Sequence, residues 1–139
     1  MTRALSLVFC LSLILSGCEL AFLPGCYTRP ELKILPQELP VAISGQPFNV
    51  RLEVPPPHTR LMGFYIDPAT PLPSGLELTY QRGESHALIS GTPRTPGVYK
   101  VSISALSNGT QCVGQQADST YQLKVVALRN PDEMRFLYP

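Results

Sequence analysis

The chain has 139 residues, of which 44% are hydrophobic and 15% are charged, which suits one globular domain with a modest core. Its formal net charge of +1 gives no overall electrostatic reason to bind nucleic acid or an anionic surface. The 15 prolines, well above the usual share of about 5%, leave little room for long helices and favour short strands and turns.

The N-terminal segment predicts export from the cytoplasm. Arg3 supplies a positive charge, and the stretch from Ala4 to Leu15 is apolar. A helix that spans a bilayer needs roughly twenty apolar residues, so this stretch is too short to cross. It predicts a secretory signal peptide over residues 1–17.

The signal peptide ends in LSGC at positions 15–18, which resembles the lipobox of bacterial lipoproteins. The resemblance implies cleavage between Gly17 and Cys18 and a diacylglycerol joined to the Cys18 sulfur, so that lipid holds the chain to a membrane. Two or three acyl chains, at about 0.8 kcal/mol per buried CH₂, give lasting attachment. An ordinary secretory signal with an incidental cysteine and a retained signal anchor are the alternatives. Glu19 is not the aspartate that retains enterobacterial lipoproteins in the inner membrane, so in a diderm host we expect the outer membrane.

Residues 18–40 contain four prolines and predict an extended, lipidated tether. Over residues 41–127, apolar and polar residues alternate with a period of two, which predicts strands with one buried face. Such stretches lie at 48–54, 76–78, 98–105 and 121–125, with a shorter alternation at 88–90 and a short apolar run at 62–66. Six or seven short strands separated by Gly and Pro predict an all-β, antiparallel β-sandwich. A C-terminal tail, residues 128–139, ends in apolar residues that either fold back or meet a partner.

Three stretches of this domain, LPSGLEL at 72–78, LISGTPRTPGVYKVSISA at 88–105 and YQLKV at 121–125, resemble immunoglobulin-like domains of bacterial surface proteins. The resemblance covers residues 45–126 and implies a single immunoglobulin-like sandwich.

In that fold several motif residues have structural roles. We expect Gly75 and Gly91 to supply positive φ in tight turns, and Pro93 to preset the turn before a strand. Gly97 and Tyr99 open the longest strand, where the Tyr99 ring packs and its hydroxyl finds a partner at the sandwich edge.

The two cysteines that follow Cys18 are Cys26 and Cys112. Because exported thiols tend to pair, we expect a disulfide between them, worth about 4 kcal/mol in the chain-entropy model. Free thiols and an intermolecular bridge are the alternatives. The cysteines and the two histidines lack zinc-site spacing, and TYQRGESHA at 79–87 replaces an Asp-rich stretch common in the family, so we expect no metal and no cofactor.

The sequence therefore predicts a non-enzymatic lipoprotein of the cell envelope, attached to the membrane by its lipid and binding another protein. Strand addition at a sheet edge is the expected mode. A glycan-binding or peptidoglycan-binding lipoprotein is the alternative, although the chain has no Trp and only six Tyr as stacking platforms. His86, next to Glu84 and Ser85, is expected to lie in a solvated turn, since neighbours in sequence rarely form a catalytic constellation.

Overall fold

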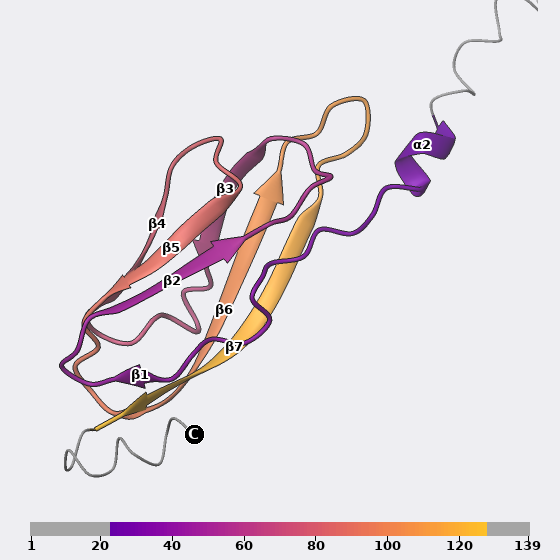
Figure 1. The fold of residues 1–139 in the computed structure, drawn as a ribbon. Helices are drawn as coiled ribbons and strands as arrows, with labels where there is room; N and C mark the ends of the chain where they lie inside the picture. The colour runs from indigo at the N-terminus through magenta and orange to yellow at the C-terminus, as the bar shows by residue number, and fades with distance from the viewer. Residues whose placement is uncertain (1–22, 128–139) are drawn as a thin grey trace, which may run out of the picture.

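The computed structural model describes residues 23–127, which form a short helix followed by two packed β-sheets (Figure 1). The elements are α2 (Leu23–Tyr27), β1 (Ala42–Ile43), β2 (Phe48–Glu53), β3 (Leu61–Ile66), β4 (Leu76–Tyr80), β5 (His86–Gly91), β6 (Gly97–Ser107) and β7 (Gln116–Val126). The predicted signal peptide with Gly17, the lipidation site Cys18, and the tail from residue 128 lie outside the described residues.

The two sheets have the strand orders β1-β7-β6-β3 and β2-β5-β4. The chain crosses between the sheets after β1, β2, β3 and β5, so each sheet contains strands from both halves of the domain. The predicted all-β sandwich of two packed sheets is therefore confirmed. One pair departs from the expected antiparallel order: β1 runs parallel to β7, because the chain enters beside β7 in the same direction before it crosses to the other sheet.

The core lies between the sheets and follows the period-two pattern of the sequence. Along β6, Val101, Ile103 and Ala105 are fully buried, and the residues between them face outward. On the facing sheet Leu52 and Ile89 are equally buried. Removing a side chain of this size from water contributes roughly 1.5–3 kcal/mol, so this alternation is the main source of the fold's stability.

Strand β3 contains a bulge that breaks the period of two. Its pairing with β6 shifts register between Leu61 and Gly63. An extra residue in one strand turns the following side chains over, so Leu61 and Phe64 both enter the core. Met62 and Tyr65 are left about half exposed, at 50% and 52%.

The second half of the predicted tether is part of the domain. Leu32 and Ile34 are buried in the core, and Leu35 exchanges two backbone hydrogen bonds of 2.8 Å with Glu53 at the end of β2. The alternation of these apolar residues with charged neighbours is what lets one face of this segment be buried. The prediction of an extended tether is also wrong for Leu23–Tyr27, because these residues form α2.

The predicted disulfide is confirmed: Cys26 and Cys112 are bonded, with 5.6 Å between their Cα atoms. It joins α2 to the loop between β6 and β7. Beside it, the Gln115 side-chain amide donates to the Pro30 carbonyl at 2.9 Å. The start of the described chain is thus held to the β6–β7 end of the sandwich.

The motif glycines lie together where the turn before β4 meets the end of β5. Gly75 and Gly91 have φ of +94° and +134°, values that favour glycine. The Thr92 amide donates to the Gly75 carbonyl at 2.8 Å, and a Cβ on Gly75 would lie 2.0 Å from the Thr92 carbonyl oxygen. Pro93, which follows, is buried. Only glycine permits two backbones to approach this closely.

Gly97 and Tyr99 open β6, the strand that runs to Ser107. The Tyr99 ring packs over Gly97, where a Cβ would lie 3.3 Å from the ring. The Tyr99 hydroxyl donates to the Thr95 carbonyl at 3.0 Å. This bond to a residue slightly upstream has the form of the tyrosine corner found in immunoglobulin-like sandwiches.

Candidate functional site

The candidate site is the flank of the sandwich formed by β3 and β4. Each of these strands pairs on one side only, β3 with β6 and β4 with β5. The two strands contact each other where the sheets meet. An edge strand carries unpaired N–H and C=O groups that can accept another strand. Of the other two edges, β1 has two residues and the end of β2 is covered by the Leu35 bridge.

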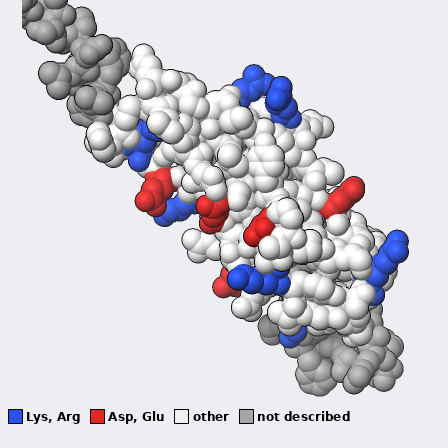
Figure 2. All heavy atoms as spheres, turned by 180° about the vertical axis from the view of Figure 1, so that it is seen from behind, with Lys and Arg blue, Asp and Glu red and all other residues white. Residues whose placement is uncertain are grey.

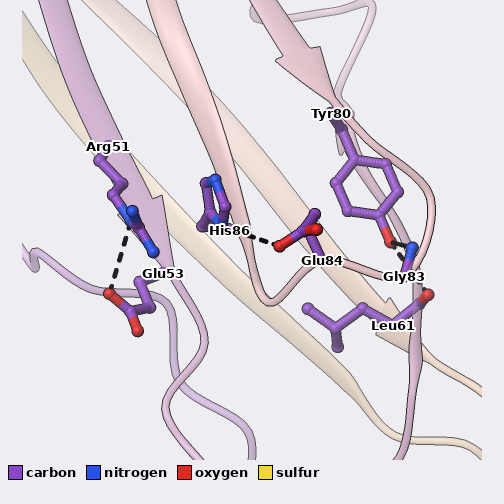
Figure 3. A network of polar contacts seen from close by, with 7 residues as sticks. All are labelled: Arg51, Glu53, Leu61, Tyr80, Gly83, Glu84 and His86. Carbon is purple, nitrogen blue, oxygen red and sulfur yellow. Dashed lines mark hydrogen bonds and ion pairs between the residues drawn. The ribbon is translucent and has the colours of Figure 1, made fainter.

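Tyr80 closes one corner of this flank (Figure 3). Its hydroxyl donates to the Leu61 carbonyl at 3.0 Å and accepts the Gly83 amide at 2.9 Å, so one phenol ties the start of β3 to the β4–β5 turn. Its ring also packs against Phe64, with centroids 5.5 Å apart. Tyr80 is therefore a structural cap, and the open part of the β4 edge is the stretch before it.

A hollow of about 190 Å³ lies beside this edge, on the solvent face of β4 and β5. Its lining residues are Thr79, Tyr80, Gln81, His86 and Leu88. His86 is the first residue of β5 and faces Glu84, with 3.6 Å between Nδ1 and the carboxylate. No serine or cysteine of the described chain is hydrogen-bonded to His86, so the pair forms a polar rim to the hollow.

The outer face of β2 carries a second exposed ion pair, Arg51 with Glu53 at 3.7 Å (Figure 3). Exposed pairs of this kind contribute only about 0.2–1 kcal/mol each. Figure 2 shows acidic and basic side chains interspersed on one face of the molecule, with uncharged surface between them. That face presents no broad field of one sign.

A second hollow, of about 250 Å³, opens where three connections meet. Arg60, Leu61, Met62, Arg82 and Asn108 line it. The Arg60 guanidinium crosses Gly83 so closely that a Cβ there would lie 2.8 Å from it. Neither arginine has an acidic partner within residues 23–127. Sequence reasoning missed this cluster, because its members come from the start of β3 and from the β2–β3, β4–β5 and β6–β7 connections, and no local pattern joins them.

The largest of the three hollows, about 440 Å³, lies between the N-terminal segment and β7. Gln37, Glu38, Leu39, Thr120, Tyr121 and Gln122 line it. The buried Tyr121 hydroxyl has no hydrogen-bond partner in the structure. Burial raises the pKa of Tyr121, and the nearby Ser119 hydroxyl, outside hydrogen-bonding geometry, offsets part of that rise.

Polar side chains pair across β6 and β7 on the outer face of the larger sheet. Ser104 donates to the Asp118 carboxylate at 2.6 Å, and the Gln116 amide donates to it at 2.8 Å. These two donors, Ser104 first, hold the pKa of Asp118 below its usual value. Tyr65 stands beside them on β3, opposite Ser104 in register, with its ring across Gly63.

Neither a metal site nor a membrane-spanning helix is found in the described part of the chain. No three His, Cys, Asp or Glu side chains gather there in a way that could hold an ion. Of the helices in residues 23–127, none combines the length and apolarity needed to cross a bilayer.

No protein-family model matches the chain, and no curated protein matches it. Among solved structures, it is similar to a point mutant of the SrpA adhesin from Streptococcus sanguinis, with a TM-score of 0.50 and 12% identity. The match covers 79% of this chain and 60% of the adhesin chain, so this chain spans less than two thirds of that neighbour's length. At this identity the likeness supports the sandwich fold alone. The lipobox and the resemblance to surface-protein immunoglobulin-like domains stay predictions.

Proposed function

We propose that this protein is a lipid-anchored, non-catalytic binding module of the cell envelope that takes an extended segment of a partner protein along the edge of β4. The observation that carries the proposal is the open β4 edge beside the hollow lined by Thr79, His86 and Leu88. In strand addition, main-chain hydrogen bonds supply affinity and a neighbouring pocket selects a side chain. The edge and the hollow offer both parts.

Two further observations support an envelope location. The motif at 15–18 resembles a lipobox, and the Cys26–Cys112 disulfide is typical of an oxidising compartment. The similar solved structure is an adhesin, which accords with a binding role for this fold.

Photo-crosslinking in cells tests the binding edge. A photo-reactive phenylalanine replaces Thr79, which is exposed on β4, or Lys100, which is exposed in the middle of the β6 face and serves as the matched control. We expect a discrete protein adduct from position 79 and none from position 100. Equal adducts from both positions, or none from position 79, would refute the binding mode.

Labelling with radioactive palmitate tests the anchor separately. The parent protein is expected to incorporate label and to partition into detergent, and Cys18→Ser is expected to abolish both. A parent protein that takes up no label contradicts the anchor whatever the crosslinking shows.

Tyr65 supports a second candidate function, the binding of a glycan. Its ring is 52% exposed and passes across Gly63, beside the polar pair of Ser104 and Asp118. Sugars stack on such rings while neighbouring polar groups bind their hydroxyls. On an array of envelope glycans, Tyr65→Ser should lose the signal and Met62→Ser, at a similarly exposed position of the same strand, should keep it. Equal signals from both variants would exclude this site.

A further inference from the structure

One end of the sandwich carries the two most exposed large apolar side chains among those described. Tyr27 is 87% exposed and Val113 is 86% exposed. Each directly follows a cysteine of the disulfide between Cys26 and Cys112. The two side chains therefore project from the same end of the molecule, on either side of the disulfide.

The backbone that presents these side chains is held in place. Besides the disulfide, the Arg29 guanidinium donates to the Val113 carbonyl at 2.5 Å and the Gln115 amide donates to the Pro30 carbonyl at 2.9 Å. Tyrosine is enriched where proteins meet the headgroup layer of a membrane, since its ring is apolar and its hydroxyl stays wet. A fixed pair of a tyrosine and an aliphatic side chain suits such a layer.

The same end also carries unpaired positive charge. The Asn108 amide donates to the Arg60 carbonyl at 2.8 Å, which places the Arg60 and Arg82 hollow next to the loop that holds the disulfide. Glu84, in the turn with Arg82, faces His86 and, within the described residues, forms no ion pair with either arginine. Free guanidinium groups near a bilayer are attracted to the phosphates of anionic lipids.

Chain length limits how far this end can lie from a lipid on Cys18. At no more than about 3.6 Å per residue up to Leu23 and about 1.5 Å per residue within α2, the Cys26 Cα lies within roughly 25 Å of the Cys18 Cα. Strand β6 has 11 residues, so at about 3.3 Å per residue the other end of the sandwich is a further 35 Å or so away.

We infer that the disulfide end of the sandwich rests on the phospholipid headgroup layer, with Tyr27 and Val113 in the interface and Arg60 and Arg82 facing lipid phosphates. This inference rests on the proposed lipid anchor. The disulfide end then contacts the membrane surface, and the opposite end, where β6 begins, points away from the bilayer.

Tryptophan fluorescence tests the orientation, because the chain has no tryptophan of its own. Val113→Trp places one at the disulfide end, and Val98→Trp places one at the start of β6, where the valine is 67% exposed. Each lipidated, full-length variant is reconstituted in phosphatidylethanolamine and phosphatidylglycerol vesicles with brominated acyl chains. Flotation confirms attachment, and mass spectrometry under non-reducing conditions confirms the disulfide.

We expect the Val113→Trp emission to shift to shorter wavelength and to be strongly quenched by the brominated lipid, and the Val98→Trp emission to do neither. Floating vesicles with an unquenched Val113→Trp variant overturn the orientation and leave the anchor intact. A shift to shorter wavelength without quenching also overturns it, because the side chain then lies against protein. Failure of both variants to float refutes the anchor and this inference with it.

Discussion

Loss of the Cys26–Cys112 disulfide is expected to destabilise the domain mainly through its unfolded state. The bridge joins residues separated by 86 positions, which in the chain-entropy model corresponds to about 4.5 kcal/mol of loop-closure entropy at 25 °C. The buried Leu32 and Ile34 stay docked in the folded variant, since their contacts do not depend on the bridge. We therefore expect Cys26→Ala with Cys112→Ala to fold and to lose about 3–4 kcal/mol.

Urea unfolding of the purified protein, followed by circular dichroism, measures the loss. With a slope of about 2 kcal/mol per M, the midpoint should fall by roughly 1.5–2 M in the double variant. Val113→Ser, which changes the same loop at an exposed side chain and keeps the disulfide, should unfold like the parent. If the double variant lost less than about 1 kcal/mol, the entropic account would be wrong and the packed segment alone would hold the chain end.

Three further predictions use the same unfolding assay or a titration. Gly75→Ala should lower the free energy of unfolding by about 3 kcal/mol, because the added Cβ meets a backbone carbonyl. The control Gly45→Ala, with φ +80° and no atom within 4 Å of the added Cβ, should lower it by about 1–2 kcal/mol. Equal losses would contradict the close approach at Gly75. Asp118 contributes stability above its unfolded pKa of about 3.9, and this is lost as pH falls through its lowered folded pKa. Ser104→Ala should raise that pKa in a carboxyl NMR titration, and an unchanged value would exclude the hydroxyl as the cause. Tyr121→Phe removes a buried hydroxyl without a partner and should leave stability unchanged or raise it by up to about 1 kcal/mol; a clear loss would mean that the hydroxyl is bonded.

The strands were predictable where a single face is buried and the alternation is local. In β6 the pattern predicted residues 98–105, and the strand extends from Gly97 to Ser107. In β7 only 121–125 was predicted, because residues 116–120 are mostly polar. That stretch is a strand since it pairs residue by residue with β6, as far as Leu106 with Gln116. Pairing with an existing strand outweighs the weak local preference.

Features made by residues distant in sequence were not predictable in the same way. Because β3 contains a bulge, its residues 62–66 form an unbroken apolar run in the sequence and do not alternate. The Arg60 and Arg82 hollow exists only because three connections converge at one end of the sandwich. The disulfide was predicted from the number of thiols and their expected compartment. The sequence did not show that the two cysteines lie close together, because that proximity depends on the fold.

The disulfide also constrains how the proposed binding edge is displayed. With Cys26 bonded to the β6–β7 loop, only the residues between Cys18 and Cys26 separate the proposed lipid from the folded domain. If the disulfide end rests on the membrane, the long axes of the strands point away from the bilayer. A partner strand added to β4 would lie along the same direction. Such a partner must present an extended segment that points toward the membrane or away from it. Cleaving the disulfide would relax this requirement, because more residues would then separate the proposed lipid from the first point at which the chain is held to the sandwich. Partner binding in the membrane should therefore depend on the bridge more strongly than binding by the same domain freed from lipid.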